Sequence, residues 1–418
     1  MAVAGDERLS EASRILREAE GRVRILRTLS WPLEVEARFF ESGGTQLPVV
    51  AYAKADPAPT LERIEAALRL LDAGDPDHAM LLRHADAIAQ GALMLGVVGT
   101  REFTEHARRI YGTPTEPILD GETTPLALAR ALADDLGRLR ALPTARTPAR
   151  IAPEELAERM RLLVAERLGH DAPAIEVAQG LASKAVAGPR RVRIAEDAEL
   201  TDDDVAQLLH HEVFVHVLTG LNGRTQDALP LLAAGHPGTT RTQEGLAVFS
   251  EVVGRVMTPD RLARLSDRVL AVALAFDGAD FVELYRFFLE RGGDPRQSFD
   301  DARRVVRGGL VTGGAPFPKD ATYLEGLVRV RCLVQAALAH GSLEPVAMLF
   351  VGKVDTEDVP TLLRLSKRGL VRAPTHLPPW LDDPRSLVSF LALEGLLQQG
   401  LGERIRSRYR EALASALD

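Results

Sequence analysis

The feature that most constrains this chain is a cluster of histidines on an apolar, helix-like segment. Three of the ten histidines stand at positions 210, 211 and 216, inside the run LHHEVFVH from Leu209 to His216. Thr201 and the three aspartates after it are typical of a helix N-terminus, so we predict a helix from Thr201 to Gly220. Several imidazoles beside a carboxylate would be costly to bury on this helix unless they bind something, and a metal ion removes that cost.

The spacing of His211, Glu212 and His216 sets a condition on this helix. In the common zinc-hydrolase pattern H-E-x-x-H, both histidines lie on one helix face and the glutamate reaches the metal-bound water. Here one more residue intervenes, and residues five apart in an α-helix are rotated by about 140°. A single π-turn returns both histidines to one face. We therefore predict a π-turn between Glu212 and His216, with His210 packed beside the site or donating a hydrogen bond to it.

A catalytic zinc site also needs a third protein ligand and an open position for water. Glu244 is the predicted third ligand, because it opens a new helix in the string QEGLA (243–247) and Gly245 allows close approach of neighbouring atoms. His236, in a His-Pro-Gly loop, is the competing ligand. Glu251 lies two helical turns after Glu244 and either orients a ligand imidazole or has an ordinary packing role.

The length of 418 residues is too great for one ordinary core, so it predicts two domains, or one large domain with a helical extension. We predict a mainly helical region over 1–150 and a catalytic domain over 151–418, divided in the proline-rich stretch from Leu142 to Pro153. Helical spacing dominates both parts, with a short strand expected at Pro48–Tyr52. Three short runs between Ile175 and Ile194 predict a small antiparallel meander. The expected class is α+β, mainly α-helical.

Composition excludes several classes of protein. The net charge of −8 and the absence of a long Lys/Arg run disfavour nucleic acid as a partner. No run approaches the length of about 18 apolar residues that a membrane span needs, and the N-terminus lacks a secretory signal, so we expect a cytoplasmic protein without membrane contact. The single cysteine, Cys332, cannot form an intrachain disulfide and is expected to be a buried structural thiol.

Three groups of motifs carry a resemblance to a known family. They are HEVFVH (211–216) with LNGR (221–224), QEGLA (243–247), and a longer segment with RVVRG (304–308), FPKD (317–320) and YLEG (323–326). The chain resembles the QEGLA-motif proteins, also labelled modulators of flavohaemoglobin expression, and their eukaryotic relatives, the microtubule-associated tyrosine carboxypeptidases. The glycine-rich run 308–314 departs from the more polar loop of that family, and this puts the shape of the specificity pocket in doubt.

The resemblance implies a zincin-like metallopeptidase that uses zinc as its cofactor. It implies His211, His216 and Glu244 as zinc ligands and Glu212 as the base that activates water, the same four residues that the spacing indicates. It also implies carboxypeptidase chemistry on the C-terminus of a peptide or protein. A tubulin substrate does not transfer to this chain.

The matched C-terminal segment offers residues for binding the substrate. Tyr323 is the predicted donor to the oxyanion, although a tyrosine there can equally be a core residue. Arg304, Arg307 and Lys319, with Arg224 as a further option, are the predicted clamp for the substrate α-carboxylate. Each of these cations can also be an ordinary surface charge. The predicted meander offers an edge strand to an extended peptide.

Three other functions stay open at this level. The same zinc, water and Glu212 would serve a non-peptidase amide or ester hydrolase, which release of a C-terminal residue would rule out. A regulatory or interaction protein with a structural or vestigial zinc site is a second alternative, although a structural zinc does not need Glu212. The third is a helical scaffold in which the histidines cluster by chance.

Overall fold

The computed structural model describes residues 2–139, 148–181 and 184–398. This part of the chain is mainly helical with a small β component, so the predicted α+β class is confirmed. The helices of the first part are α1 (Ala2–Glu20), α2 (Ile25–Thr28), α3 (Leu33–Glu41), α4 (Ala58–Leu68), α5 (Ala79–Gly96), α6 (Arg101–Tyr111) and α7 (Pro125–Leu139).

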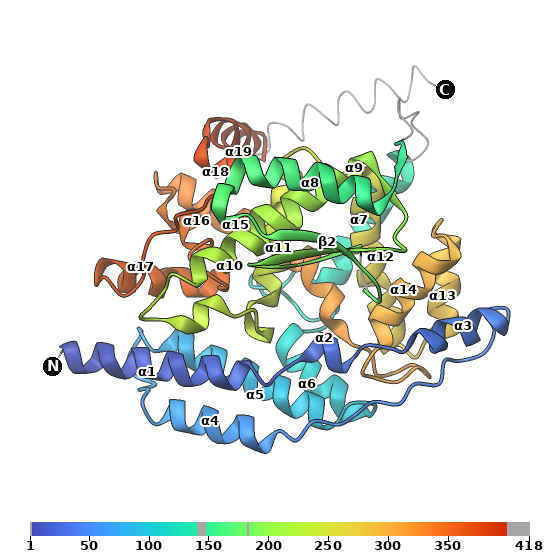
Figure 1. The fold of residues 1–418 in the computed structure, drawn as a ribbon, viewed down its shortest axis with the longest axis horizontal. Helices are drawn as coiled ribbons and strands as arrows, with labels where there is room; N and C mark the ends of the chain where they lie inside the picture. The colour runs from blue at the N-terminus through green and yellow to red at the C-terminus, as the bar shows by residue number, and fades with distance from the viewer. Residues whose placement is uncertain (1, 140–147, 182–183, 399–418) are drawn as a thin grey trace.

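A longer series of helices follows residue 150 (Figure 1). Its members are α8 (Pro153–Leu168), α9 (Asp202–Leu208), the π-helix η2 (Leu209–Val217), α10 (Leu218–Gly223), α11 (Thr240–Val253), α12 (Pro259–Phe276), α13 (Phe281–Glu290), α14 (Pro295–Val306), α15 (Thr322–Ala339), α16 (Glu344–Met348), α17 (Val359–Lys367), α18 (Pro379–Asp382) and α19 (Arg385–Gln398). Short 3-10 helices lie at η1 (Gly169–Asp171), η3 (Pro230–Ala233), η4 (Pro237–Thr239), η5 (Pro318–Ala321) and η6 (Thr356–Asp358).

The strands form two small sheets. One is an antiparallel pair of β1 (Arg150–Ile151) and β5 (Leu200–Thr201), and the other contains β2 (Ala174–Ala178), β3 (Ala185–Gly188) and β4 (Arg191–Ala195) in the order β2-β4-β3. Strands β3 and β4 pair antiparallel as predicted. Strand β2 pairs parallel with β4, so the prediction of an entirely antiparallel meander is wrong. Residues 182–183 of the expected middle strand lie outside the described residues.

The three-stranded sheet, α8 and the π-helix share one hydrophobic cluster. Val192 and Ile194 of β4 are buried in it, whereas Arg191 and Arg193 point away. This alternation is typical of a strand with one face on a core. The sheet therefore packs beside the π-helix, and β3 contacts it directly. The other members of the cluster include Leu156, Met160 and Val164 of α8 and Val213 and Val217 of the π-helix.

The N-terminal helices pack on the helices that follow residue 150. The largest hydrophobic cluster combines residues of α1, α4, α5 and α6 with residues of α11, α15 and α17. In Figure 1 these N-terminal helices form the lower layer of the molecule. The division into regions 1–150 and 151–418 stays a prediction, and residues 140–147 of the expected linker lie outside the described residues.

The run Pro48–Tyr52 forms no strand, contrary to the prediction, and Val49 is 84% exposed. The run is held by the Tyr52 hydroxyl instead, which accepts hydrogen bonds from Trp31 Nε1 at 2.6 Å and from the Gly308 backbone N–H at 2.8 Å. A β-strand is stabilised by hydrogen bonds to a neighbouring strand, and this apolar run has no such neighbour among the described residues. Tyr52 thereby ties the N-terminal region to the glycine-rich loop 308–314.

Gly308 shows why this loop is rich in glycine. Its φ is +82°, and a Cβ atom there would lie 2.4 Å from the ring of Phe103 in α6. The Gly308 carbonyl also accepts a hydrogen bond from the Gly99 N–H at 2.8 Å. The loop is therefore packed tightly against the N-terminal layer, and only glycine fits at its first position.

Cys332 is exposed, so the prediction of a buried thiol is wrong. Val330 and Val334 of α15 are fully buried, and Cys332, two positions from each, lies on the opposite face of the helix. None of the helices in the described part of the chain combines the length and apolar character of a membrane span.

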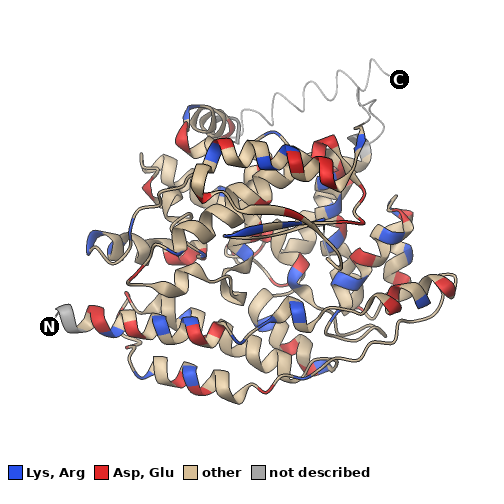
Figure 2. Ribbon diagram, in the orientation of Figure 1, with Lys and Arg blue, Asp and Glu red and all other residues tan. Residues whose placement is uncertain are grey.

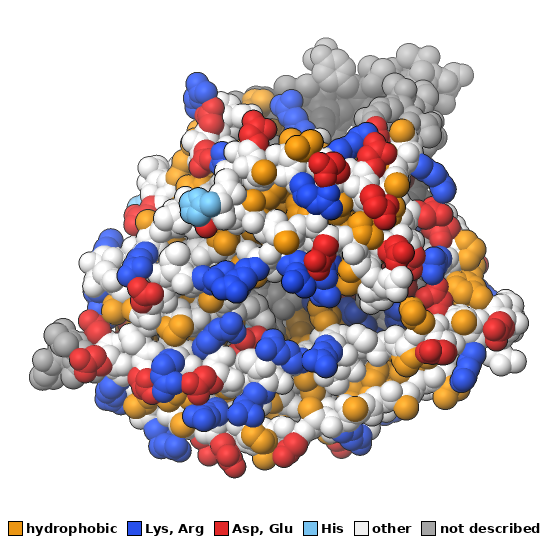
Figure 3. Space-filling model, viewed as in Figure 1, with side chains coloured by type: hydrophobic (Ala, Val, Ile, Leu, Met, Phe, Trp, Pro, Cys, Tyr) orange, Lys and Arg blue, Asp and Glu red, His pale blue; other side chains and the backbone are white. Residues whose placement is uncertain are grey.

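Charged residues are spread over the molecule. Figure 2 shows acidic and basic residues interspersed along the ribbon, in keeping with the modest net charge of −8. Figure 3 shows that one face is hollowed between the small sheet and the N-terminal helices, and that Lys and Arg side chains gather around the hollow.

Candidate metal centre

The histidine cluster lies on a π-helix, as its spacing predicts. The π-helix Leu209–Val217 is continuous with α9 before it and α10 after it. The Thr201 cap is also confirmed: its side chain and that of Asp204 form a reciprocal capping box. The predicted helix end at Gly220 is wrong, since the helix continues to Gly223. Gly220 instead lies close to another segment, where a Cβ atom would be 3.0 Å from Pro189.

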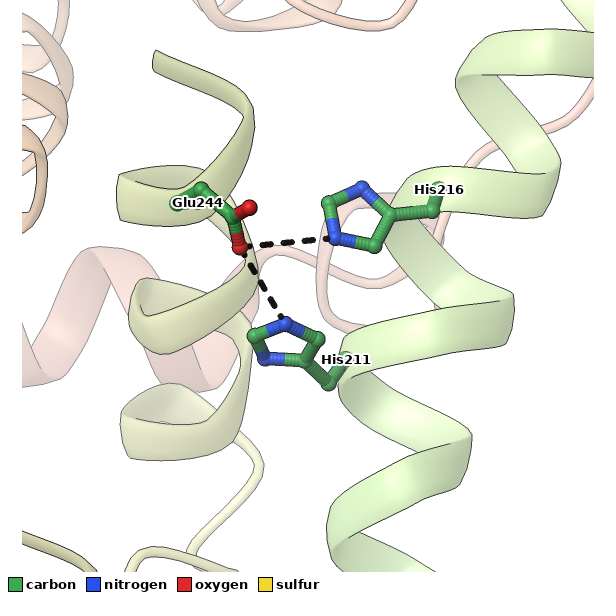
Figure 4. A group of neighbouring side chains, drawn as sticks. All are labelled: His211, His216 and Glu244. Carbon is green, nitrogen blue, oxygen red and sulfur yellow. Dashed lines mark ion pairs between the residues drawn. The ribbon is translucent and has the colours of Figure 1, made fainter. Parts of the chain in front are cut away.

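Two imidazoles and a carboxylate converge at the centre of this region (Figure 4). Glu244 Oε2 lies 3.6 Å from His211 Nε2 and 3.8 Å from His216 Nε2. One ligand atom from each residue lies within 4.8 Å of the others. The three side chains come from two facing helices, the π-helix and α11, which pack against each other.

The separations fit a metal ion. Two donors bound to zinc at about 2 Å with tetrahedral angles lie about 3.4 Å apart, close to the observed 3.6 and 3.8 Å. Nitrogen and carboxylate donors are ligands that zinc accepts. The side chains of His216 and Glu244 keep 16% and 15% of their surface exposed, so a small molecule can reach the group.

The electrostatics favour a positive charge between these side chains. Burial alone would lower the pKa of His211, but hydrogen bonds with Glu244 and Glu251 outweigh it and raise the pKa to about 10. Burial and the charge of Lys353 hold the pKa of His216 well below its ordinary value. A metal ion can replace the proton on His211, since proton and metal compete for the same nitrogen.

Glu251 binds the imidazole of His211 on the side away from Glu244. Its Oε1 lies 2.7 Å from His211 Nδ1, which leaves Nε2 facing Glu244. Arg261 binds Glu251 through two nitrogens at 3.1 Å, and Gln207 donates to Glu251 Oε1 at 2.9 Å. A carboxylate on the far nitrogen fixes the orientation and tautomer of a ligand histidine. Two roles were predicted for Glu251, and the geometry supports orientation of a ligand imidazole rather than ordinary packing.

Lys319 occupies the other oxygen of Glu244. Its ammonium lies 2.8 Å from Glu244 Oε1, so Oε2 faces the histidines. Lys319 Nζ also lies 3.4 Å from the Tyr323 hydroxyl, one turn further along the chain. Gly245 and Gly326 make this arrangement possible, because a Cβ on Gly245 would lie 2.1 Å from the Gly326 backbone. The predicted close approach at Gly245 is thus confirmed, between α11 and α15.

Glu212 is buried next to the group. Burial raises its pKa to about 7, with the charge of Glu244 adding to the effect and His211 opposing it. The backbone N–H of Ala187 in β3 donates a hydrogen bond to its carboxylate. A carboxylate with a pKa near neutrality can both accept and return a proton.

The residues of the predicted carboxylate clamp differ in how far other side chains already engage them. Arg304 is fully engaged, with two bonds of 2.7 Å to the carboxylate of Asp320. Arg307 is 5% exposed, and its Nε has no hydrogen-bond partner among the described residues. Arg224 is exposed at the end of α10. Among the predicted arginines, Arg307 is the buried cation with hydrogen-bonding capacity left.

The other two histidine candidates do not join the group. His210 packs on Phe214 and lies 3.3 Å from Ser250 Oγ, which fits the packing role predicted for it. His236 is buried elsewhere, with its ring centroid 4.5 Å from that of His84. The structure therefore places Glu244, not His236, beside His211 and His216.

Two residues near the group were missed by the sequence analysis. Arg261 holds Glu251, and Lys353 Nζ donates to the His216 backbone carbonyl at 2.9 Å. Neither belongs to a motif with known spacing. Lys353 lies 137 positions from His216, and no local signal indicates such a contact.

The fold and the candidate metal group together fit one class of enzyme. A mainly helical chain that converges two imidazoles and a carboxylate beside a buried glutamate has the side chains that a metal-dependent hydrolase requires.

Comparison with known protein families identifies the chain more closely. Residues 37–398 match the microtubule-associated tyrosine carboxypeptidases, and the chain belongs to that family. The predicted resemblance is confirmed, and the family supports a carboxypeptidase-like peptidase activity. No curated protein matches the chain in a sequence comparison.

Proposed function

We propose that this protein is a zinc-dependent carboxypeptidase that removes one residue from the C-terminus of a peptide or protein. The observation that carries the proposal is the convergence of His211, His216 and Glu244 within 4.8 Å beside the buried Glu212. Membership of a carboxypeptidase family supports the direction of the chemistry. A structural zinc site would have no use for Glu212 in this position.

His211, His216 and Glu244 would hold the zinc. When bound, zinc supplies a Lewis acid that polarises the scissile carbonyl and lowers the pKa of water. Glu212 takes the proton of the attacking water and passes it to the leaving amine, for which its pKa of about 7 is suited. Glu251 and Lys319 hold the ligands in place, each through one hydrogen bond to a ligand side chain.

Tyr323 is the proposed donor to the oxyanion. Its hydroxyl lies near the Glu244 side of the group, 3.4 Å from both Lys319 Nζ and Arg304 Nη2. These two cations stabilise negative charge around the hydroxyl. A donor placed where charge develops in the transition state is among the largest contributions to catalysis.

Arg307 is the proposed ligand of the substrate α-carboxylate. Lys319 and Arg304 are engaged by Glu244 and Asp320, and Arg224 is exposed. A guanidinium can bond both oxygens of a carboxylate, and burial strengthens the attraction. The free carboxylate at the end of the substrate would complete the hydrogen bonding of Arg307.

The test compares the native chain with Glu212→Gln and Arg307→Ala, after elemental analysis for zinc. Peptides with varied C-terminal residues are assayed by mass spectrometry, with C-terminally amidated copies as matched controls. We expect release of one residue from the free acids and not from the amides. Glu212→Gln should keep the zinc and lose about 10²–10⁴-fold in turnover. Arg307→Ala should lose about 10–100-fold in kcat/KM, the value of a charged hydrogen bond.

Each opposite outcome has a definite meaning. A native chain that neither contains zinc nor takes it up would overturn the proposal. Equal cleavage of acids and amides would exclude a carboxypeptidase and favour another zinc amidohydrolase.

A further inference from the structure

The C-terminal end of the π-helix is held by three polar side chains outside the metal ligands. The Thr219 hydroxyl donates to the Val215 carbonyl at 2.6 Å, and Lys353 Nζ donates to the His216 carbonyl at 2.9 Å. Gln243 Oε1 accepts from Lys353 Nζ at 2.9 Å and lies 3.0 Å from Thr219 Oγ1, whose single hydrogen is shared with the closer Val215 carbonyl. We name Thr219, Gln243 and Lys353 the carbonyl brace.

These contacts fall where a π-helix needs them. A π-helix is rarely stable in isolation, and its junction with an α-helix changes the hydrogen-bond register, so that carbonyl groups lose their regular partners. A buried carbonyl without a partner costs about 1–3 kcal/mol. The Val215 carbonyl also accepts from the Leu218 backbone N–H, so the contact that matters most is the one from Lys353 to the carbonyl of His216, the second histidine of the proposed site.

The carbonyl brace also connects the two helices that carry the proposed ligands. Gln243 immediately precedes Glu244 on α11, while the His216 carbonyl belongs to the π-helix. Lys353 bonds to both, through its contacts with Gln243 and with the His216 carbonyl. A short bridge of hydrogen bonds, in which no ligand side chain takes part, therefore links the backbone of His216 to the residue before Glu244.

Lys353 is itself fixed by its backbone. Its N–H donates to the Leu232 carbonyl at 2.7 Å. A Cβ on the preceding Gly352 would lie 2.5 Å from the same carbonyl oxygen, so the loop fits only with glycine at that position. Asn222 of α10 donates to the Phe350 carbonyl at 2.8 Å and fastens the loop from the other side. These contacts fix the loop that carries Lys353, and with it the position of the Lys353 ammonium.

We propose that Lys353, acting with Gln243 and Thr219, is a positioning residue that keeps the π-helix in register and sets the distance between His216 and Glu244. The inference rests on the proposed function, because it assumes that these side chains bind a metal. Lys353 acts through the backbone and does not touch the metal or the substrate. Its absence would let the helix relax toward α-helical register, which turns His216 away from His211.

The experiment uses Co²⁺ as a probe, because the visible absorption of the bound ion reports its ligand geometry. The full chain is freed of metal and titrated with Co²⁺ against a competing chelator, for the native protein, Lys353→Met and Lys353→Arg. Lys184→Met is the matched control, since Lys184 forms a partly buried ion pair with Asp204 at the opposite end of the same helix. Thermal unfolding of each metal-free protein is recorded alongside.

We expect Lys353→Met to bind Co²⁺ about 10–100-fold more weakly, with a changed visible spectrum, as for other groups that orient metal ligands. Lys353→Arg should recover part of the affinity and the native spectrum. Lys184→Met should lower the unfolding temperature but leave affinity and spectrum unchanged. If Lys353→Met does not fold, Thr219→Val, which removes one hydroxyl and keeps the shape, decides by the same two readouts.

The failures are distinguishable. Native affinity and spectrum in Lys353→Met, or in Thr219→Val where that variant decides, overturn the positioning role and leave the proposed function intact. A native chain that takes up neither Co²⁺ nor zinc overturns both.

Discussion

Two groups of buried histidines in this protein have similar composition and different geometry. The first is the group of His211, His216 and Glu244. The second pairs His84 and His236, whose ring centroids are 4.5 Å apart, with Asp358, which lies 2.8 Å from His84 Nε2. In the second group both nitrogens of His236 lack hydrogen-bond partners among the described residues.

The difference teaches what a candidate metal group requires beyond histidines. In the first group three donor atoms converge, and the far nitrogen of His211 is held by Glu251. In the second, His84 points its bonded nitrogen at Asp358, and the nitrogens of His236 face the core. Convergence of three donor atoms distinguishes the two groups, whereas residue type and a carboxylate bonded to one imidazole do not.

The largest expected effect separates the groups directly. His216→Ala should reduce bound zinc from about one ion per chain to none, because a two-donor site binds weakly. His236→Ala removes an imidazole that is even more deeply buried and should leave the zinc content unchanged. Elemental analysis of the purified proteins measures both. Loss of zinc in His236→Ala would show that the second group also contributes to binding.

The supporting carboxylates give the next effect. Glu251→Gln should weaken zinc binding about 10–100-fold, because the amide orients His211 less firmly. Asp358→Asn makes the same change in the second group and should alter stability but not zinc affinity. Competition with a fluorescent chelator measures the dissociation constants. Equal affinities for Glu251→Gln and the native chain would contradict the orienting role.

The second histidine group should instead affect how the free energy of unfolding depends on pH. Burial, together with the charge of His84, holds the pKa of His236 well below its ordinary value. The unfolded chain therefore binds a proton below about pH 6.5 that the folded chain excludes, and the free energy of unfolding falls by up to about 1.4 kcal/mol per pH unit as pH drops. This contribution is fully present above that pH.

Urea unfolding of metal-free protein between about pH 7.5 and 5.5 measures this dependence. His236→Leu removes the group, and its free energy of unfolding should fall less steeply than that of the native chain. Parallel slopes for the two proteins would mean that the folded chain takes up the proton without penalty.

The smallest effect is expected at His210, which is a neighbour of the first group in sequence but not in function. His210→Gln should lose one weak hydrogen bond to Ser250 and cost about 1 kcal/mol in stability. Zinc affinity should stay within about twofold of the native value, since no ligand contacts this side chain. A large loss of affinity would extend the candidate metal group by one residue.

The local parts of the candidate site could be predicted from the sequence. The five-residue spacing of His211 and His216 is incompatible with a shared face on an α-helix, and the π-helix follows from that conflict. Glu244 could be predicted because it stands next to Gly245 in the QEGLA motif. Such signals lie within one helix, where sequence distance and spatial distance are closely related.

The remaining parts depend on contacts that are distant in the chain. Strand β2 pairs in parallel with β4 and not with its neighbour β3, which no local pattern indicates. The Pro48–Tyr52 run reads as a strand until Tyr52 is seen to bond to Gly308, 256 positions away. Lys319 and Arg304 look like free cations in sequence, and their partners Glu244 and Asp320 become visible only in the fold.

The bond between Tyr52 and Gly308 bears on how the protein can be shortened. A chain that begins at residue 151 would lose Tyr52, Phe103 and the amide of Gly99, three of the contacts that shape the loop next to Arg307. It could keep all four residues of the proposed zinc chemistry and still lose the position of Arg307, the proposed ligand of the substrate α-carboxylate. Tyr52→Phe would remove one of these three contacts from the full-length protein with the loss of a single oxygen atom.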